Sequence, residues 1–438
     1  MLQRGNITRR QFLRTVVTST GAIIFPYVVP SSSLGKAGNI APSSRITLGF
    51  IGTGKQSKHL IKSFLRPDTQ MLAACDVDKL KLQRALNMAE EYYAEKTGGT
   101  YKGCAGYSDF RDLLARDDID AVVIATPDHW HAIIVIQSAA AGKDIFCEKP
   151  LSQTVVEARA MACAVRRYGR VFQTGSMQRS DRRFRFACEL VRNGYIGQVK
   201  HVTVGVGGPP EDKPLLAEPV PDYLDWDMWV GPALWRPYSS ELSPHISVDV
   251  FPHWRYHSSF GGGAMTDWGA HHFDIAQWGL GMDDTGPVEI IPPDGKDYMV
   301  LTYKYANGIT MTRDKAKGIL FTGTKGKIEV NRGYLQTWPE SLKDVQIGPN
   351  EGSRGAGSQI HLYESNNHYT DWLDAIRSRG KPICDVEIGC RSVIVCHLGN
   401  IAYELKRPLK WDTEKEVLVG DDEANRLLSR PMRSPWHL

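Results

Sequence analysis

Short apolar runs alternate with longer amphipathic segments through the part of the chain that follows residue 44. Five of these runs predict buried strands: 46–51, 71–75, 121–125, 144–147 and 171–174. Segments between them carry apolar residues at helical spacing, as at Leu60, Ile61 and Phe64. Strands that alternate with helices are typical of a parallel sheet covered by helices on both faces. The pattern therefore predicts a doubly wound α/β domain here.

Chemically active residues follow directly after these predicted strands. The run 144–147 breaks into a carboxylate, an ammonium and Pro150, which cannot continue a strand ladder. The residues at the five strand ends include Gly52, Asp76, Thr126, Glu148, Lys149 and Arg179. Ligands of open parallel sheets bind at the carboxyl ends of the strands. We therefore expect these residues to gather at one ligand-binding edge, although each alone is equally compatible with a surface turn.

A different pattern begins after the last of these strands. The ranges 298–305 and 309–313 alternate apolar and polar residues around Ala306-Asn307-Gly308, which predicts a β-hairpin. A second hairpin is predicted within 320–330, and a strand within 198–206. Helical patterns occupy 184–192, 368–379 and 386–405. This half of the chain is therefore expected to form an antiparallel sheet with its own helices.

The first 44 residues are expected to lie outside the fold. Arg9 and Arg10 are followed by Phe12 and Leu13, a moderately apolar run to Pro30 and a serine cluster, which is the order of a twin-arginine export signal. The apolar run is too short and too polar for a membrane anchor. We therefore predict export through the twin-arginine pathway, to the periplasm or beyond, with no stable membrane anchor.

Composition narrows the function classes. The formal charge is +4, but residues 1–44 contribute five basic residues and no acid, which leaves about −1 for the remainder and predicts no nucleic-acid partner. The eight cysteines include no Cys-x-x-Cys pair, and we interpret them as buried free thiols that form neither disulfides nor a zinc site.

The first strand and helix carry a dinucleotide-binding pattern. Gly52 and Gly54 permit a tight turn and a close approach of a pyrophosphate to the helix N-terminus. Asp76 ends the second strand, 24 positions past Gly52, near the spacing at which a carboxylate binds a ribose 2′-hydroxyl. Ser57 replaces the usual third glycine or alanine but is small. The pattern predicts an NAD site and makes NADP less favoured.

A polar helix in the second half supplies candidate acid and base groups. Asp267 and His271 are four residues apart, so they share one face of a helix, and Asp274 continues that face. Beside Lys149 they form a set that can move a proton, whereas alone they are compatible with a solvated helix face. A metal site at His271 and His272 is disfavoured because adjacent helical residues point about 100° apart. We predict no metal.

The motifs together resemble those of the Gfo/Idh/MocA oxidoreductase family over nearly all of residues 45–438. The matching pieces are Gly52-Thr53-Gly54, Thr126-Pro127-Asp128-His129-Trp130-His131, Glu148-Lys149-Pro150, the stretch 173–179 and the stretch 261–274. The resemblance implies an N-terminal Rossmann domain and a C-terminal α/β domain with a large, open, mostly antiparallel sheet. It also implies a carbohydrate or cyclitol substrate and a homo-oligomer, either a dimer or a tetramer.

This resemblance gives the domain boundaries and the site. We assign 1–44 to the signal and linker, 45–177 to the Rossmann domain, 178–365 to the substrate and dimerisation domain, and 366–438 to helices and a tail that pack back on the body. The expected cofactor contacts are Gly52, Gly54, Lys55, Gln56, Asp76, Thr126, Pro127, His129, His131, Glu148 and Lys149. The expected substrate contacts are Gln178, Arg179, Tyr256 and His272, with Lys149, Asp267 and His271 as catalytic residues.

Three functions remain open at this stage. The first is hydride transfer between NAD and a hydroxyl carbon of a sugar, glycoside or cyclitol. The second is redox-neutral glycoside cleavage through transient oxidation at C3, although the glycosidase branch of this family departs from the Glu148-Lys149-Pro150 pattern that this chain keeps. The third is a non-catalytic sugar-binding protein, which the intact Lys149, Asp267 and His271 disfavour.

Overall fold

The computed structural model describes residues 40–348 and 359–438, so the predicted export signal lies outside the described residues. The chain divides into two units, Met1–Arg45 and Ile46–Leu438. In the first unit, the described residues form a short 3-10 turn, η2 (Pro42–Ser44).

A six-stranded parallel sheet forms the N-terminal half of this unit, in the order β3-β2-β1-β4-β5-β6. Its strands are β1 (Ile46–Ile51), β2 (Thr69–Cys75), β3 (Ala105–Tyr107), β4 (Ala121–Ile124), β5 (Asp144–Cys147) and β6 (Phe172–Thr174). Its connecting helices are α2 (Lys55–Phe64), α3 (Lys79–Thr97), α4 (Phe110–Leu114), α5 (Asp128–Ala140) and α6 (Val155–Arg167). The five strands predicted from apolar runs and the Rossmann fold are confirmed.

The strand order of this sheet creates the binding edge. Strands β4 and β5 are buried along their whole length, as a sheet covered on both faces requires. The chain order reverses between β1 and β4, which pair in parallel. A crevice opens outside the carboxyl ends of the strands at such a switch point. Gly52, Asp76, Thr126 and Glu148 follow β1, β2, β4 and β5, so the fold brings them to this crevice.

A nine-stranded mixed sheet forms the C-terminal half, in the order β13-β12-β11-β7-β10-β9-β8-β14-β15. Its strands are β7 (Val199–Val204), β8 (Glu289–Ile291), β9 (Thr302–Lys304), β10 (Thr310–Arg313), β11 (Ile319–Gly323), β12 (Lys327–Asn331), β13 (Tyr334–Trp338), β14 (Leu409–Asp412) and β15 (Val417–Leu418). Among the strand pairs that the structure describes in this sheet, only β7 with β10 is parallel. The two predicted hairpins are present, and the expected mostly antiparallel sheet is confirmed.

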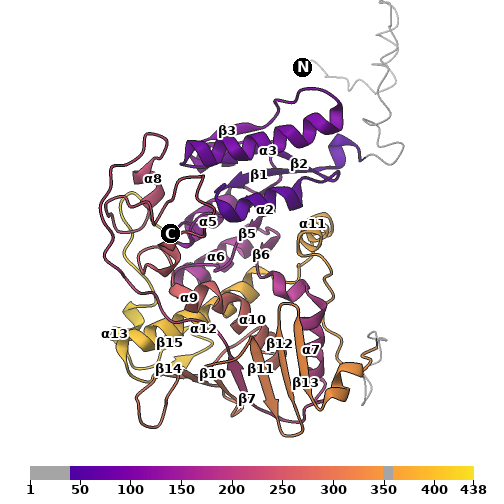
Figure 1. Ribbon diagram of the computed structural model, residues 1–438, viewed down its shortest axis with the longest axis vertical. Coiled ribbons are helices and arrows are strands. Elements are labelled where there is room, and N and C mark those ends of the chain that lie inside the picture. Colours follow the sequence, from indigo (N-terminus) through magenta and orange to yellow (C-terminus); the bar gives the residue numbers. More distant parts are fainter. Residues whose placement is uncertain (1–39, 349–358) are drawn as a thin grey trace, which may run out of the picture. The chain divides into compact units, whose positions relative to one another are not determined.

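Helices lie between the two sheets (Figure 1). The remaining helices are α7 (Arg182–Arg192), α8 (Trp226–Val230), α9 (Gly263–Asp267), α10 (Gly269–Leu280), α11 (His368–Ser378), α12 (Val386–Leu405) and α13 (Asp422–Arg426). The short 3-10 helices are η3 (Met177–Ser180), η4 (His253–Tyr256) and η5 (Glu340–Asp344). Helices α10 and α12 pack on each other, and α12 also packs on α6. Eleven consecutive residues of α10 are buried, because the helix is enclosed on all sides.

One prediction about the helix that carries Asp267 needs correction. The sequence predicts one continuous helix through Asp267, His271 and Asp274, but the structure divides it at Trp268 into α9 and α10. Trp268 keeps helical backbone angles, φ −89° and ψ −29°, so the two pieces remain close to collinear. Gly269 directly follows the division, and the conformational freedom of glycine weakens a helix.

The C-terminal segment returns to the Rossmann sheet. Trp372 of α11 is fully buried, and its ring centre lies 5.4 Å from that of Phe64 and 5.7 Å from that of Phe146. Near the chain end, the Trp436 ring centre lies 4.8 Å from that of Trp130. These aromatic contacts tie the last helices and the tail to helices and strands of the N-terminal half.

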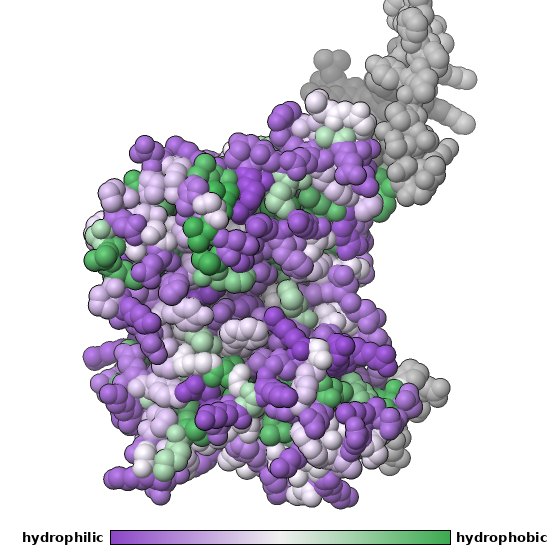
Figure 2. Space-filling model, viewed as in Figure 1, coloured by the Kyte–Doolittle hydropathy of each residue, from purple (hydrophilic) through white to green (hydrophobic). Residues whose placement is uncertain are grey.

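The surface and the thiols complete the description. All eight cysteines are free and seven are buried, whereas Cys163 is exposed, which corrects the prediction for that residue because its position on α6 faces solvent. No helix among residues 40–348 and 359–438 is long and apolar enough to cross a membrane. Figure 2 shows that hydrophobic residues are scattered among hydrophilic ones on the face that it displays.

Candidate functional site

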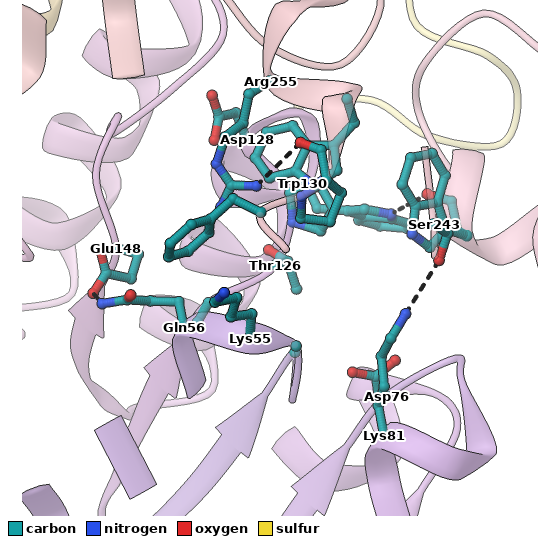
Figure 3. Close-up of a pocket in the computed structure, with 18 of the residues that line it drawn as sticks. Lys55, Gln56, Asp76, Lys81, Thr126, Asp128, Trp130, Glu148, Ser243 and Arg255 are labelled. Carbon is teal, nitrogen blue, oxygen red and sulfur yellow. Dashed lines mark hydrogen bonds between the residues drawn. The ribbon is translucent and has the colours of Figure 1, made fainter. Parts of the chain in front are cut away.

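A cavity of about 510 Å³ lies at the carboxyl ends of β1, β2, β4 and β5. The strand ends form one wall, and the segment 242–256 together with α9 and α10 forms the other, as Figure 3 shows in part. Lining side chains thus come from both halves of the fold. This cavity is called the strand-end pocket below.

The glycine turn after β1 packs closely against the chain that follows β4. Gly52 has φ +82°, and a β-carbon at this position would lie 2.7 Å from the backbone nitrogen of Thr126. A side chain is therefore excluded at Gly52. Gly54 precedes α2, and no side chain caps the first turn of that helix. Ser57 is buried and its hydroxyl donates to the Gly52 carbonyl, which explains how a serine fits the third position of the motif.

Asp76 is held beside the glycine turn. Its Oδ2 accepts hydrogen bonds from the Thr53 backbone nitrogen at 2.6 Å and from the Thr53 hydroxyl at 2.8 Å. Its Oδ1 accepts from the Asp78 backbone nitrogen at 2.9 Å. Burial raises the pKa of Asp76, while Lys81 acts against that rise. The carboxyl group is thus fixed at the pocket edge where the sequence predicts a ribose contact.

The first turn of α2 contacts the segment that covers the pocket. Lys55 Nζ donates to the backbone oxygen of Asp249 at 2.6 Å, and the Asp249 carboxylate lies 3.5 Å from Nζ of both Lys55 and Lys58. Lys55 Nζ also lies 4.9 Å from the ring centre of Phe251. Segment 242–252 is therefore attached to the helix terminus where an anion would bind.

Thr126 and Glu148, which follow β4 and β5, differ in whether their side chains have a hydrogen-bond partner. The hydroxyl of Thr126 is buried and has no hydrogen-bond partner among the described residues. Glu148 is 6% exposed, and its Oε1 accepts from Gln56 Nε2 at 2.9 Å (Figure 3). Burial raises the pKa of Glu148. Thr126 is therefore free to bind a ligand, whereas Glu148 is already bonded to Gln56.

Lys149 and Asp267 form the central ion pair of the pocket. Lys149 Nζ donates to Asp267 Oδ1 at 2.7 Å and to its backbone oxygen at 2.8 Å. Arg255 Nε lies 3.9 Å from the same Oδ1. Burial pushes the pKa of Asp267 up, but Lys149, Arg255 and Arg332 together hold it below its ordinary value. Asp267 is therefore a carboxylate at neutral pH, and it fixes the position of the Lys149 ammonium.

His271 lies one turn beyond Asp267 and lines the same pocket. Its side chain is buried, and its Nδ1 has no hydrogen-bond partner among the described residues. Burial lowers the pKa of His271 well below its ordinary value, and the nearby charges of Lys149 and Arg332 lower it further. The imidazole is therefore neutral at pH 7 and retains a nitrogen that can accept a proton.

Asp128 is a buried acid in the wall of the pocket, near Arg255 (Figure 3). Its side chain is 4% exposed. Burial raises the pKa of Asp128 to about 8, although Arg255 and Lys149 lower it in part. Asp128 is therefore largely protonated at neutral pH and adds little charge to the pocket.

Two predicted cofactor contacts lie behind the pocket wall. His129 Nε2 contacts the Trp229 backbone oxygen at 3.0 Å. His131 contacts the backbone oxygens of Pro150 at 2.9 Å and Thr126 at 3.0 Å. Both histidines are buried and neither lines the pocket. Successive residues of α5 point in different directions, so Asp128 faces the cavity while these histidines bond the surrounding backbone.

Of the four predicted substrate contacts, the structure places only Tyr256 in the pocket lining. Arg179 is 1% exposed, and its guanidinium binds Asp274 Oδ2 at 2.8 Å and Asp283 Oδ1 at 2.7 Å. Arg179 and Asp274 thus form a buried ion pair beneath the site. His272 Nδ1 contacts the Gly205 backbone oxygen at 3.0 Å, so this imidazole points toward the second sheet.

Gln178 lies directly behind the predicted catalytic helix. In the amide orientation that satisfies its contacts, it donates to the His271 backbone oxygen at 3.0 Å and accepts from Arg332 Nε at 3.2 Å. It is buried and does not line the pocket. Gln178 therefore supports two residues that do.

Sequence reasoning missed several residues of the pocket. Arg255, Trp268, Arg332 and the segment 242–252 all line it. Arg332 sits in the turn Asn331-Arg332-Gly333 between β12 and β13, which reads as an ordinary exposed hairpin turn. Arg255 follows a long irregular segment that has no periodic pattern.

The residues present fit a nicotinamide dinucleotide. The Gly52 turn, the uncapped start of α2, the unpartnered Thr126 hydroxyl and the fixed Asp76 follow one another along the sheet edge. A helix terminus suits a pyrophosphate, and a carboxylate at this spacing suits a ribose hydroxyl. No cluster of three or more metal-ligating side chains exists within residues 40–348 and 359–438.

Comparison with known proteins agrees with both halves of the fold. Residues 46–176 match the model of an oxidoreductase family described as an NAD-binding Rossmann fold. Residues 210–438 match the model of its C-terminal alpha/beta domain. A glycosyl hydrolase family 109 protein of Shewanella baltica is 30% identical over 209 residues, 45% of each chain. The chain therefore spans less than half the length of that curated relative.

Solved structures show the same fold over most of the chain. The aldose-aldose oxidoreductase from Caulobacter crescentus, complexed with glycerol, aligns with a TM-score of 0.55 and 19% identity, over 84% of this chain and 99% of that one. The WlbA dehydrogenase from Bordetella pertussis, in complex with NADH and UDP-GlcNAcA, aligns with a TM-score of 0.55 and 18% identity over the same shares. By its two matched domains, the chain belongs to the Gfo/Idh/MocA family of oxidoreductases.

Proposed function

We propose that the protein transfers hydride between NAD and a hydroxyl carbon of a sugar, glycoside or cyclitol. The observation that carries this proposal is the placement of Lys149, Asp267 and His271 around one pocket at the cofactor edge. Lys149 and Asp267 come from different halves of the fold and meet at 2.7 Å. Such a pairing of a fixed ammonium, a carboxylate and a neutral imidazole suits proton movement at an alcohol.

The chain's own residues have distinct tasks in this proposal. When bound, NAD supplies the hydride acceptor at its nicotinamide ring. The His271 imidazole takes the hydroxyl proton, because its lowered pKa keeps it neutral at pH 7. The Lys149 ammonium stabilises negative charge on the reacting oxygen, and Asp267 holds that ammonium in place. The segment 242–252 lines the pocket opposite the strand ends.

A second function, redox-neutral glycoside cleavage, is favoured by one specific observation. The glycosyl hydrolase family 109 protein of Shewanella baltica is among the curated relatives at 30% identity. Against it stands the retained Glu148-Lys149-Pro150 pattern. The two functions differ in net redox, because a dehydrogenase accumulates reduced cofactor and a glycosidase of this kind returns the hydride. A non-catalytic sugar-binding protein would do neither.

A panel of free sugars and glycosides tests these functions together. Absorbance of reduced nicotinamide and release of aglycone are recorded in the same reactions. Accumulation of reduced cofactor supports hydride transfer to NAD. Aglycone release without net reduction supports the glycosidase, and binding without either change supports the non-catalytic protein. Cofactor that remains bound through purification and turns over without net reduction would also favour self-recycling chemistry.

The choice of cofactor gives a prediction at Asp76. We expect NAD to bind more tightly than NADP, because the carboxylate repels a 2′-phosphate and accepts a hydrogen bond from a 2′-hydroxyl. Asp76→Ala should narrow this difference in dissociation constant, measured by calorimetric titration of both cofactors. Tighter binding of NADP by the wild-type protein would contradict the prediction. Asp109→Ala, at another partly exposed acid on the Rossmann half, should leave the ratio unchanged.

Export gives a second prediction, which concerns residues outside the described part of the chain. We propose that Arg9 and Arg10 address the protein to the twin-arginine pathway. Replacing both with lysine should leave the protein in the cytoplasm, folded and able to bind NAD, because the signal is an address and contributes nothing to the core. Cell fractionation with an antibody measures this. Undiminished export of the double variant would rule out the twin-arginine interpretation.

A further inference from the structure

Two arginines that line the strand-end pocket, Arg84 and Arg332, form no ion pair with a described residue, but Arg84 already donates to the backbone oxygens of Thr53 and Gly54. Arg332, in the turn between β12 and β13, lines the pocket and forms no ion pair with any described residue. Its Nε is 3.2 Å from the Gln178 side-chain oxygen, and its guanidinium carbon is 4.9 Å from the Trp268 ring centre. These two contacts orient the guanidinium. They leave its two terminal nitrogens without a hydrogen-bond partner in the described part of the chain.

The other cations of the pocket are already engaged. Lys149 is paired with Asp267 at 2.7 Å. Arg255 lies 3.9 Å from the same carboxylate, and its guanidinium carbon is 4.9 Å from the ring centre of Phe251. The same Phe251 ring centre lies 4.9 Å from Nζ of Lys55, which is on the cofactor side of the pocket. Because Arg255 and Lys55 share this ring, Arg255 also belongs to the cofactor side. Arg332 instead stands beside Trp268 and His271, on the side where a substrate would reach the imidazole.

The acidic groups near Arg332 do not neutralise it. Asp267 and Glu148 both act to raise the pKa of Arg332. The Asp267 carboxylate, however, binds Lys149, and the Glu148 carboxylate accepts a hydrogen bond from Gln56. Burial raises the pKa of Glu148, although Lys149 and Gln56 act against that rise. Arg332 is exposed at the pocket, so its guanidinium is open to an anion that enters there.

We propose that the substrate is a sugar acid whose carboxylate is bound by the open guanidinium of Arg332. The inference rests on the proposed function, because it assumes that the substrate occupies the pocket beside His271. A guanidinium presents two parallel N–H donors that match the two oxygens of a carboxylate. One unpaired cation also matches one negative charge, whereas a phosphate monoester carries nearly two. The ring of the sugar acid would then lie between Arg332 and the Lys149 and His271 pair.

Calorimetric titration of the NAD-loaded protein tests this with matched sugars. The probes are D-glucuronate against D-glucose, D-galacturonate against D-galactose, and glucose 6-phosphate for a phosphate. At least one uronate should bind roughly tenfold or more tightly than its neutral partner. Arg332→Gln should weaken uronate binding by roughly tenfold to a hundredfold and leave neutral sugars unchanged. Arg332→Lys keeps the positive charge but loses the two parallel N–H donors of the guanidinium. Its affinity for uronates should therefore lie between those of the wild type and Arg332→Gln.

Controls separate this inference from folding and from the proposed function. Lys327→Gln removes one positive charge from β12, the strand that leads into the Arg332 turn, at a position outside the pocket lining, and should have no effect on the uronate preference. Thermal unfolding should show that Arg332→Gln folds as the wild type does. Equal binding of acid and neutral sugars, tighter binding of the phosphate, no binding of any probe, or an uronate preference that survives Arg332→Gln would each overturn the inference. Uronate binding that depends on Arg332 but leads to no hydride transfer would support it and contradict the dehydrogenase.

Discussion

Replacing His271 with alanine is expected to lower the rate of hydride transfer by roughly a hundredfold or more, since positioned acid and base groups contribute on that scale. The affinity for NAD should change far less, because His271 faces the substrate side of the pocket beside Lys149. Asp267→Asn should have a similar effect, since it releases the Lys149 ammonium from its 2.7 Å contact. Single-turnover kinetics with saturating NAD measures both.

The effects of these substitutions should fall short of additive. Groups that act as one unit lose most of their contribution when any member is removed. Lys149→Ala is expected to disturb both the rate and NAD binding, because its strand end borders the cofactor edge. His201→Ala, on the second sheet and outside the pocket lining, is the matched control and should keep the wild-type rate. If His271→Ala keeps the wild-type rate or fails to fold, the imidazole has a structural role and not a catalytic one. The non-catalytic sugar-binding protein would then be the favoured interpretation.

Asp128→Asn is expected to stabilise the protein, and the gain should grow with pH. Burial raises the pKa of Asp128 to about 8 in the folded protein, against a value of about 3.9 in an unfolded chain. Between these two values the folded state keeps a proton that the unfolded state has lost. The stability that Asp128 contributes is therefore full below about pH 4 and declines as pH rises towards 8. Asparagine does not titrate, so it avoids this decline.

The difference between variant and wild type isolates this effect. Chemical unfolding at a series of pH values between 5 and 9 should show a free-energy difference that increases with pH up to about 8 and then levels. Asp267→Asn should show a constant difference over this range and a change only below about pH 4, because the pKa of Asp267 is held below its ordinary value. Its wild-type carboxylate contributes stability that is present at neutral pH and is lost as pH falls. A constant difference for Asp128→Asn over this range would show that Asp128 is ionised throughout.

Apolar runs predicted the architecture because a strand that is buried on both faces is apolar along its own short sequence. Strands such as Asp144–Cys147 are fully buried, so their sequences carry unbroken apolar runs. The carboxyl end of a parallel strand is also readable from sequence, which placed Gly52, Asp76 and Lys149 at one edge. The hydroxyl of Ser57 illustrates a departure from the motif that the structure explains, since it bonds the Gly52 carbonyl.

The remaining site residues depend on contacts between distant segments. Arg332 contacts Gln178 and Trp268, which are distant in the sequence, and an Asn-Arg-Gly turn carries no trace of those contacts. Arg179 was expected to meet the substrate because it follows a strand end, but its partner Asp274 is 95 residues away and encloses it in a buried pair. Helical periodicity placed Asp267 and His271 on one face but gave no sign that α9 ends between them.

The most direct test of the account follows a labelled hydrogen. A sugar that the protein accepts is prepared with deuterium on the carbinol carbon and mixed with stoichiometric protein and NAD, and the cofactor is analysed by mass spectrometry after one turnover. Hydride transfer predicts reduced nicotinamide that carries one deuterium, formed slowly by His271→Ala and at the normal rate by His201→Ala. Product formation with a cofactor that stays oxidised and never acquires the label would contradict hydride transfer in this pocket.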